Sequence, residues 1–378
     1  MRVLIVCLEN WDTLSEIPFI LKSAGCAVDV FCSKDSWLLS NSFYDKWIER
    51  KNQQIEYINQ VEEFVNTGDY DWIILADDVI IKQINESHFN EHQLARLLPI
   101  SNLNYRSILS SKIGLSNFCF ENKIASPAYV LYNNSNDLDN IQSKIRFPVI
   151  NKIDFSWGGA NMFVSNDIES FKSNLHLLPL NQNTMVQEFI IGEEVPVEAL
   201  FYKGELLEYI TSKILVFDKG PFSLSTKRLY YDNPDLKPLL KALGKKLGIT
   251  GFANMAYIKE SSSGVYNLIE IDLRPNSWMA YGKFCNRDFS KALKQFFNAH
   301  TVSLNESNND FQSIEISLFF KDVRRGFWQN DLKSILKWIF NFKHYWQFIP
   351  LYDLKLMKRI MRELGKIIKQ KITNLFNH

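Results

Sequence analysis

The spacing of hydrophobic and polar residues predicts a βαβ unit at the start of the chain. Residues 2–8 form an apolar run with the character of a buried strand, residues 13–24 repeat with a helical period, and Gly25 ends that helix. A second strand is expected over residues 27–32. The later apolar run over residues 72–76 predicts a further buried parallel strand, with Asp77 and Asp78 at its carboxyl end.

The pattern changes at about residue 98. Helical segments come first, and β-rich sequence then runs from about residue 148 to 274, with a helix expected over 236–247. Residues 261–264, Ser-Ser-Ser-Gly, separate strand-like runs at 252–259 and 265–271, which is typical of a hairpin turn. This part of the chain therefore predicts a separate mixed α+β unit that follows the α/β opening.

Composition narrows the class of protein. The chain has 378 residues, of which 46% are hydrophobic, so it can bury a large core in two or three packed units. We find neither an apolar run long enough to span a membrane nor a signal peptide, and we expect a cytoplasmic protein. Five scattered cysteines without a CxxC pair and six dispersed histidines indicate neither a disulfide framework nor a zinc site.

Charge is distributed unevenly along the chain. Residues 311–378 contain thirteen lysines and arginines against five acidic residues, which gives +8 and leaves −7 for the first 310 residues. This end is also rich in aromatic residues, and a helix over residues 356–376 would carry lysines and arginines opposite an apolar stripe. The stripe consists of Leu356, Ile360, Met361, Leu364, Ile367, Ile368, Ile372 and Leu375.

Two interpretations of this basic helix remain open. It could lie on an anionic membrane surface at the inner face of the membrane, or it could dock on the protein with its basic face in water, which we favour. Nucleic acid is not an expected partner, because base stacking would need exposed aromatic side chains.

The opening βαβ unit invites comparison with dinucleotide-binding folds. The loop after the first strand, residues 9–13, reads Glu-Asn-Trp-Asp-Thr and lacks the GxGxxG pattern. Without those glycines the backbone cannot approach a pyrophosphate, so a nicotinamide enzyme is disfavoured.

Three later segments contain the residues suited to chemistry. The first is a strand that ends at Lys152, followed by residues 156–160, Ser-Trp-Gly-Gly-Ala, which we call the lid loop. Glycines allow backbone N–H groups to approach phosphate oxygens, and a lysine offers a charge to the same polyphosphate. A structural Gly-Gly hairpin would give the same pattern.

The second segment, residues 185–199, predicts a strand, a tight turn and a second strand dense in carboxylates. Strand backbone groups could hold an adenine and a carboxylate could accept from ribose hydroxyls, although an exposed acidic hairpin would look alike. The third segment, residues 267–276, places Glu270, Asp272 and Arg274 on one strand face. Two carboxylates suit magnesium and the arginine could grip a phosphate, whereas a solvated strand face is the alternative.

Taken in order, these segments resemble the ATP-grasp superfamily, which includes D-alanine-D-alanine ligase, biotin carboxylase and the large chain of carbamoyl phosphate synthetase. The resemblance runs from the first strand to about Gly282. It implies a Rossmann-like pre-ATP-grasp domain over residues 1–97 and a two-lobed ATP-grasp domain over 98–304, with a lid lobe at about 115–185. A helical, basic C-terminal extension would follow over 305–378.

The resemblance also implies an activity. Members of this family activate a carboxylate with ATP and magnesium as an acyl phosphate and join it to a nucleophile. We therefore expect an ADP-forming carboxylate-amine or carboxylate-thiol ligase that uses ATP and Mg²⁺ or Mn²⁺ and acts on small molecules. A nucleotide-sugar glycosyltransferase and a non-catalytic ATP-binding scaffold are the alternatives.

By resemblance, individual residues receive expected roles. Lys112 and Lys152 would reach the nucleotide phosphates beneath the lid loop with Ser156, Gly158 and Gly159. The adenine and ribose contacts would come from Gln187, the backbone of Glu188 and Ile190, and Glu194. The metal and catalytic groups would be Glu270, Asp272 and Arg274.

Two positions depart from the family pattern. Asp272 stands where asparagine is usual, and Ala256 stands where the preceding strand usually supplies a metal ligand. Asn254 shares a strand face with Ala256 and could supply its amide oxygen instead. The residues considered for the acceptor substrate are Lys213, Lys227, Arg228, Asn276, Trp278 and Arg287; for the lysines and arginines, a solvated surface position is the alternative.

Overall fold

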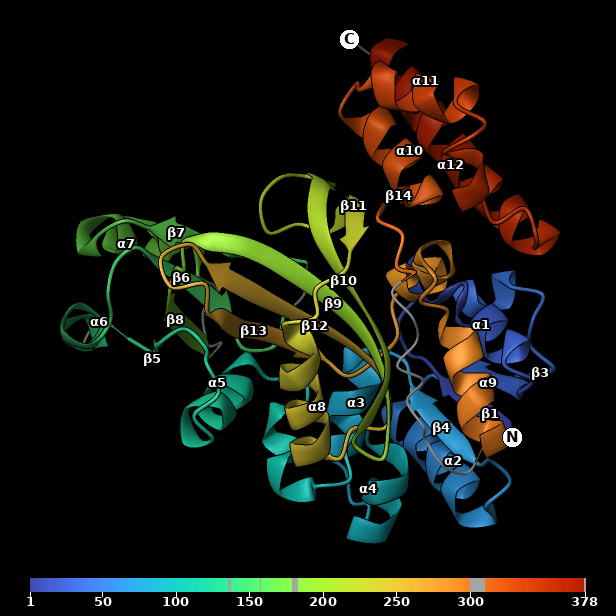
Figure 1. Cartoon of the computed structure of the whole chain (residues 1–378), viewed down its shortest axis with the longest axis horizontal. Coiled ribbons are helices and arrows are strands. Elements are labelled where there is room, and N and C mark those ends of the chain that lie inside the picture. Colours follow the sequence, from blue (N-terminus) through green and yellow to red (C-terminus); the bar gives the residue numbers. More distant parts are fainter. Residues whose placement is uncertain (135–136, 157, 179–182, 300–309, 377–378) are drawn as a thin grey trace.

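The computed structural model describes residues 1–134, 137–156, 158–178, 183–299 and 310–376, which contain three β-sheets (Figure 1). The first sheet has the strand order β3-β2-β1-β4, and every pairing in it is parallel. Its strands are β1 (Arg2–Val6), β2 (Ala27–Cys32), β3 (Lys46–Glu49) and β4 (Trp72–Leu75). Its helices are α1 (Ile17–Ser23), α2 (Gln54–Thr67), α3 (Asp78–Asn85) and α4 (Glu91–Leu97).

This sheet confirms the parallel opening, with one difference. The helix expected over residues 13–24 is split into a short 3₁₀ turn, Asp12–Leu14, and helix α1, which begins at Ile17. Pro18 lies in the first turn of α1, where its missing N–H group costs nothing. The same proline in the interior of a longer helix would break a backbone hydrogen bond, so the helix begins only here.

The second sheet is antiparallel and has six strands in the order β13-β12-β9-β10-β11-β14. The expected hairpin around residues 261–264 joins β12 to β13, and α8 covers the predicted residues 236–247. The strands are β9 (Gly192–Tyr202), β10 (Glu205–Phe217), β11 (Ser225–Tyr231), β12 (Gly251–Glu260), β13 (Tyr266–Asp272) and β14 (Ile314–Ser317). The accompanying helices are α8 (Leu236–Leu247), the 3₁₀ segment η6 (Ser277–Cys285) and α9 (Phe289–Ala299).

A third, smaller sheet of order β5-β8-β6-β7 has its own apolar core, formed by Ile141, Ile145, Val149, Phe171 and Val186. Its elements are α5 (Lys112–Glu121), β5 (Tyr129–Tyr132), α6 (Leu138–Lys144), β6 (Val149–Ile153), β7 (Val164–Ser165), α7 (Ile168–Asn174) and β8 (Thr184–Glu188). Strands β8 and β9 are consecutive in the chain but belong to different sheets. The interpretation of residues 185–199 as an acidic hairpin is therefore wrong, and the turn between them crosses from one sheet to the other.

Strand alternation gives the second sheet two different faces. Val195, Val197, Met255 and Tyr257 pack into a core that is shared with the first sheet and with α8. The alternate residues of the same strands, among them Glu194 and Glu198, point to the opposite face. The central strands therefore expose a polar surface to the space near the small sheet while their other face is fully packed.

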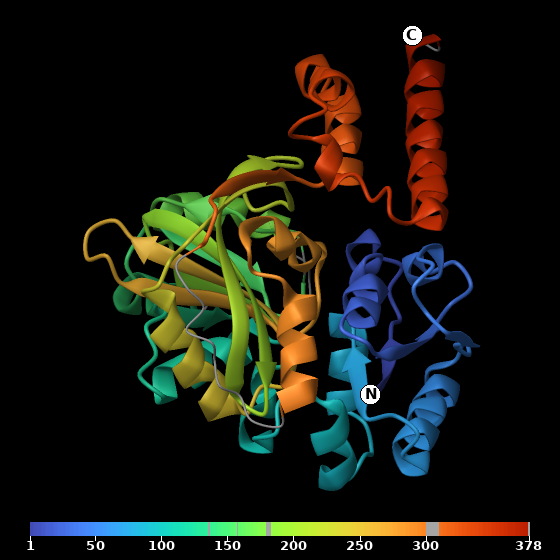
Figure 2. The ribbon, with the colours of Figure 1, turned by 45° about the vertical axis from the view of Figure 1, so that its right-hand side comes forward.

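The C-terminal part is tied to the second sheet. Strand β14 pairs with β11 as the outermost strand, and three helices follow it (Figures 1 and 2). These are α10 (Phe319–Trp328), α11 (Leu332–Phe340) and α12 (Leu354–Phe376). The domain boundary expected at residue 304 lies outside the described residues.

Helix α12 docks on the protein along its first half. Leu356, Ile360 and Leu364 are buried in the core that includes α1 and η6, while Met361 is 55% exposed. The side chains of Ile372 and Leu375 lie outside the described residues. The docked interpretation is thus confirmed for Leu356, Ile360 and Leu364, whereas Met361 and Ile368 of the same stripe are exposed. In the described residues, no helix combines the length and apolarity needed to cross a bilayer.

Candidate active site

The polar face of the second sheet collects the carboxylates that the sequence singled out. Strand register places Glu270 opposite Ala256 and Asp272 opposite Asn254, with no irregularity between these two pairs. Asn254 in turn lies opposite Glu198 on β9. Because the register is regular, all five side chains stand on the same face. The expected shared face of Glu270 and Asp272 is therefore present, and Ala256 does occupy the position directly across from Glu270.

Lys152 lies near the end of β6 and approaches this face from the small sheet. Its side chain is only 7% exposed, and burial lowers its pKa to about 8, although the charges of Glu270 and Glu194 act to raise it. Among the described residues, no hydrogen bond or ion pair links Lys152, Glu194 or Glu270 to any side chain. Three charged groups therefore converge on one site and are held apart from one another.

Burial raises the pKa of Glu194, and the charge of Arg228 opposes that shift. Glu270 raises it further, whereas Lys152 lowers it. The pKa of Lys152 and the pKa of Glu194 each depend on the charge of the other residue and on that of Glu270. The two sheets bring together residues that are more than a hundred positions apart in the chain.

Lys112 adds a second amine beside Lys152. It is the first residue of α5, and its Nζ donates to the carbonyl oxygen of Ser156 at 2.6 Å. Asp154 explains this placement, because its Oδ1 accepts from the Ser111 hydroxyl at 2.8 Å and from the Ile113 N–H at 2.9 Å. The sequence analysis did not single out Asp154. Its position two residues after Lys152 joins the start of α5 to the end of β6.

The lid loop approaches the hairpin between β10 and β11. Gly158 and Gly159 both have positive φ, +64° and +72°, which favours glycine. A Cβ atom at Gly159 would lie 2.2 Å from the carbonyl oxygen of Phe222, whereas a Cβ at Gly158 would meet nothing within 4 Å. Trp157, the aromatic residue of this loop, lies outside the described residues. The second glycine is thus required by a close approach as well as by its backbone conformation.

The expected adenine contacts are only partly available. Gln187 is 2% exposed and lies in the middle of the small sheet, paired on both sides. The N–H of Glu188 already donates to the carbonyl of Ala128 at 2.9 Å, so it is not free for a base. Ile190, in the crossing segment, makes no backbone hydrogen bond to another described residue. The Glu188 N–H is therefore occupied, and a contact between a base and the backbone of Ile190 stays a prediction.

Arg274 connects the carboxylate face to the first sheet. Its Nε lies 2.7 Å from Asp78, at the start of α3, and its Nη2 lies 2.9 Å from Asp272. Burial is the largest influence on Asp272 and raises its pKa to about 8, while Arg274 acts to lower it. Asp78 was noted only as the end of a strand, and the structure gives it a partner in the site. Two carboxylates, those of Asp78 and Asp272, therefore hold the guanidinium of Arg274 in place.

The far end of the polar face is built around Arg228. Its Nη1 lies 2.9 Å from Glu198, a wholly buried carboxylate, and its Nε donates to the Ser225 hydroxyl at 2.7 Å. The guanidinium also stacks 4.4 Å from the centre of the Trp278 ring. Asn276 donates to the same Glu198 oxygen at 3.3 Å. Of the expected acceptor residues, Arg228, Asn276 and Trp278 are thus brought together.

Helix α10 contributes a lysine that the sequence analysis missed. Lys321 is 5% exposed, and its nearest carboxylate, Asp12, is 3.9 Å away. Burial lowers its pKa, and the charges of Arg324 and Arg228 act in the same direction. Lys321 also lines a small pocket together with Asp12 and Ser277. Nothing in the local sequence pattern around Lys321 marks it as a buried residue.

Solved structures with the same arrangement of sheets set this site in context. A structure of N5-carboxyaminoimidazole synthetase from Staphylococcus aureus with ADP matches 78% of this chain and 76% of its own, with a TM-score of 0.59 and 12% identity. L-amino acid ligase from Bacillus licheniformis matches 78% and 73%, with a TM-score of 0.55 and 15% identity. The chain has the ATP-grasp fold.

A third ATP-grasp match is the biotin carboxylase domain of 2-oxoglutarate carboxylase from Hydrogenobacter thermophilus, whose structure contains MgADP and bicarbonate. It covers 83% of this chain and 72% of its own, with a TM-score of 0.57 and 13% identity. No protein-family model matches the chain, and no curated sequence matches it. At these identities the likeness establishes the fold alone.

Three residues expected near the acceptor substrate of the ATP-grasp site lie elsewhere. Lys213 is half exposed and pairs with Glu193 at 3.1 Å, on the face opposite Arg228. Lys227 also points away from Arg228, its neighbour in β11, and donates to the hydroxyl of Tyr345 at 2.6 Å. Adjacent strand residues point to opposite faces, so Lys227 and Arg228 could not both have entered the site.

Arg287 is the third correction. It follows η6 and faces Glu208 at 3.8 Å and Asp232 at 3.7 Å. These acids belong to the other end of β10 and to the segment after β11. The two carboxylates that Arg287 faces are therefore not those of the Lys152 site.

The donor set partly fits a magnesium ion. Glu270, Asp272 and the amide oxygen of Asn254 are hard oxygen donors on one face, and magnesium takes few protein ligands when phosphates supply the others. The described residues contain no group of three His, Cys, Asp or Glu side chains arranged to hold a metal ion. A metal here would therefore depend on nucleotide phosphates for much of its coordination.

A larger pocket lies away from these residues. It is lined mainly by apolar side chains at the amino end of β4 and the ends of β9 and β12, among them Trp72, Phe201 and Phe252. Arg274 reaches its rim, but Lys152, Glu194 and Glu270 are not part of its lining. We assign the chemistry to the converging charges, because an apolar pocket offers few groups for a polyphosphate.

Proposed function

We propose that the protein is an ADP-forming ligase that activates a small carboxylate with ATP and transfers it to an amine or thiol. The observation that supports this most directly is Lys152, a buried lysine without an ion-pair partner among the described residues, placed between Glu194 and Glu270. Burying an unpaired charge is costly. The negative charge of a bound polyphosphate would compensate that cost, so the buried lysine is suited to binding one.

The proposed roles follow from position. Lys152 and Lys112 neutralise phosphate oxygens, and Gly158 and Gly159 allow the lid loop to close over them. Glu194 accepts from the ribose, and Ile190 faces the base. Glu270 and Asp272, with Asn254, hold Mg²⁺, which supplies charge neutralisation at the phosphates when bound. Arg274, already aligned by Asp78, stabilises the transferred phosphoryl group.

We place the acceptor substrate at the Arg228 end of the face. Arg228 and Lys321 are buried cations, and the charge of Arg228 acts on the pKa of both Lys321 and Glu194. They suit an anionic group on the substrate, and Asn276 can orient it. Lys321→Met is expected to raise KM for the substrate about tenfold without changing KM for ATP. An equal rise in both KM values would place Lys321 outside the acceptor pocket.

The proposal is tested by ADP release across a panel of amino acids and small carboxylates. Release is expected only when a carboxylate and a nucleophile are both present. Glu270→Gln is expected to lower that rate about 100-fold, because one transition-state contact is lost. Glu205→Gln, on an exposed position of β10, serves as the matched control and keeps the rate. Full activity in Glu270→Gln would refute the assignment.

A non-catalytic ATP-binding scaffold remains the second candidate, because Ala256 lies across from Glu270 where a metal ligand would be useful. Such a protein would gain thermal stability with Mg-ATP and release no ADP with any substrate pair. Ala256→Glu would then restore turnover if the missing ligand were the cause. The glycosyltransferase alternative has no support from the structural matches, which have the ATP-grasp fold.

A further inference from the structure

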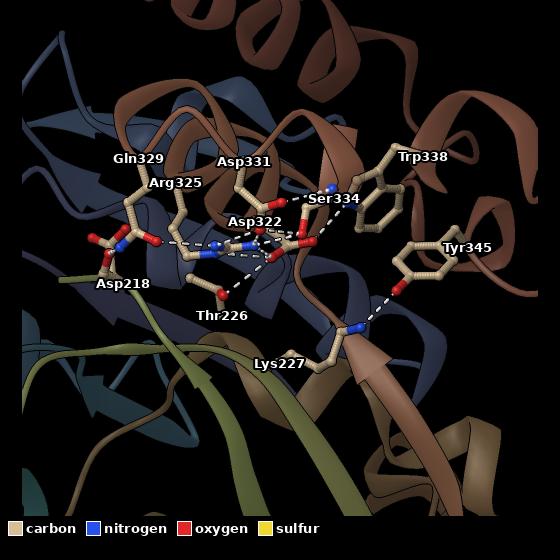
Figure 3. A network of polar contacts seen from close by, with 10 residues as sticks. All are labelled: Asp218, Thr226, Lys227, Asp322, Arg325, Gln329, Asp331, Ser334, Trp338 and Tyr345. Atoms are coloured by element: carbon tan, nitrogen blue, oxygen red, sulfur yellow. Dashed lines mark hydrogen bonds and ion pairs between the residues drawn. The ribbon is translucent and has the colours of Figure 1, made fainter. Parts of the chain in front are cut away.

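Helix α11 turns Ser334 and Trp338 toward the protein. Asp331 caps the helix by accepting from the Ser334 N–H at 3.1 Å, and the Ser334 hydroxyl donates to the same carboxylate at 2.7 Å (Figure 3). Arg325 donates to the Ser334 hydroxyl at 2.8 Å. The indole of Trp338, which is 4% exposed, donates to Asp322 at 2.8 Å. These contacts fix which side of α11 faces inward.

The opposite side of α11 is apolar and lies in water. Leu332 is 68% exposed, Leu336 50%, Ile339 49% and Phe340 70%. Residues at this spacing share one helix face. Just beyond the helix, Phe342 is 58% exposed and Trp346 is 40% exposed, and their ring centroids lie 4.6 Å apart. We call these six residues the α11 face.

An ordinary surface helix hides its apolar stripe, whereas α11 buries Trp338 and leaves four other large apolar side chains exposed. Single exposed apolar side chains need no explanation, but a contiguous group of large ones marks an interaction surface. The inward side is also fully satisfied by hydrogen bonds, so rotating α11 would break them. The exposure of the α11 face is therefore a fixed property of the fold.

Charge beside the α11 face points to the kind of partner. Lys333, Lys337 and Lys343 are exposed and border the apolar residues, without ion pairs to other described residues. Residues 332–352 contain no aspartate or glutamate. The wider segment from 311 to 378 carries a net charge of +8. An apolar stripe edged by lysines and aromatic rings is the composition of a helix that lies in a lipid interface.

We propose that the α11 face binds the surface of an anionic membrane. The leucines and aromatic rings enter the boundary between headgroups and acyl chains, and the three lysines extend toward anionic headgroups. A second copy of this chain fits the surface less well. In a symmetric dimer the same face meets itself, which would bring the lysines of both copies together without an acid to pair them.

This membrane contact differs from the one considered for the final helix. The first half of the apolar stripe of α12 packs into the core, as Leu356 and Ile360 show. The α11 face has no such neighbour among the described residues. The proposal is also independent of the ligase activity, so either can fail while the other stands.

Vesicle flotation of the full chain tests the proposal. Vesicles of phosphatidylcholine alone are compared with vesicles that also contain phosphatidylserine, at low and high salt. We expect the protein to float with the anionic vesicles and to be released by salt. Replacing Lys333, Lys337 and Lys343 by glutamine is expected to weaken binding about 100-fold, at about fivefold per lysine.

The apolar contribution is tested with Leu332→Ser, Leu336→Ser and Phe340→Ser combined. A matched control combines Ile55→Ser, Phe120→Ser and Leu239→Ser, which are 69%, 80% and 42% exposed on other helices. We expect the first variant to stay in solution and the control to float as the wild type does. Both variants are checked for an unchanged melting temperature, because all six positions are exposed.

Two results would overturn the proposal. The first is flotation that is absent for the wild-type chain, or that the α11 substitutions leave unchanged. The second is a wild-type dimer in solution that the same three serine substitutions convert to a monomer. That outcome would assign the α11 face to a second copy of the chain.

Discussion

The molecule contains two groups of buried charges that are treated in opposite ways. At the proposed nucleotide site, Glu194 and Glu270 both act on the pKa of Lys152, yet none of the three forms an ion pair with a described residue. At the C-terminal end, Asp322 and Arg325 pair at 3.1 Å and share their remaining hydrogen bonds with Thr226, Asp331, Ser334 and Trp338. Figure 3 shows the hydrogen bonds and ion pairs that link the residues of this second network.

The difference separates charges that serve stability from charges that serve a ligand. A buried network contributes to a unique structure only when every member is satisfied. Charges that stay apart in a buried site are unfavourable for the empty protein, and such sites are typical of binding and catalysis. Removing a residue from each group should therefore have opposite consequences, and that contrast can be measured.

The largest expected effect is on stability, in the C-terminal network. Asp322→Ala leaves Arg325 and the indole of Trp338 without their shared acceptor in a buried position. We expect the free energy of unfolding to fall by about 3–5 kcal/mol, measured by urea denaturation. Glu169→Ala, which removes an exposed ion pair with Lys172, is the control and should change little. A similarly small change for Asp322→Ala would contradict the structural role of the network.

The next largest effect is expected on the rate of ADP release, from a change in the proposed nucleotide site. Lys152→Met removes the amine and keeps much of the apolar length of the side chain. We expect ADP release to fall about 100-fold, while the free energy of unfolding stays the same or rises because an unpaired charge is no longer buried. Lys241→Met, on the exposed side of α8, is the matched control. A loss of stability as large as that of Asp322→Ala would erase the contrast.

The lid loop allows a smaller and more specific test with two adjacent glycines. Both have positive φ, so alanine is strained at either position, but only at Gly159 would the new Cβ meet the Phe222 carbonyl oxygen. We expect Gly159→Ala to weaken Mg-ATP binding about tenfold more than Gly158→Ala, measured by calorimetry. Equal losses in the two variants would show that the approach to Phe222 is not needed for nucleotide binding.

The smallest expected effect concerns the reactivity of Lys152. Burial lowers its pKa to about 8, so at pH 8 about half of it is neutral and can react with an acylating reagent. An approaching polyphosphate favours the protonated form, raises the pKa and slows the reaction. We expect mass spectrometry to show that Mg-ATP slows the labelling of Lys152 and leaves the labelling of Lys241 unchanged. Equal labelling rates, with and without nucleotide, would speak against this placement.

Local patterns were sufficient for most of the fold. The parallel opening, helix α8 and the β12–β13 hairpin follow from periodicity and turn residues, which depend on near neighbours in the chain. The two strands expected over residues 185–199 are present, and the alternative of a hairpin fails because β8 and β9 belong to separate sheets. The shortened first helix depends on one residue, Pro18.

The candidate site was predictable where resemblance or strand period applied. The shared face of Glu270 and Asp272 follows from alternation, and the approach of Lys152 follows from the order of the ATP-grasp segments. Lys321 and Asp78 could not be found in this way, since both join the site from elements whose packing no local pattern specifies. The place of Lys213 could not be predicted locally, because the face it shares depends on how β10 pairs with β11.

The orientation of helix α11 could not be predicted from the sequence either. Its apolar residues have an ordinary amphipathic spacing, and nothing in that spacing reveals which face is turned inward. Asp331 and Asp322 decide the orientation through contacts with Ser334 and Trp338. Orientation therefore becomes visible only when the partners of the polar side are known.

The most direct test of the central claim is a crystal structure of the chain with Mg²⁺ and a non-hydrolysable ATP analogue. We predict that the triphosphate lies between Lys152 on one side and Glu270 on the other, with the lid loop above it and the metal bound to Glu270. A nucleotide bound elsewhere, for instance in the apolar pocket beside Trp72, would contradict the account.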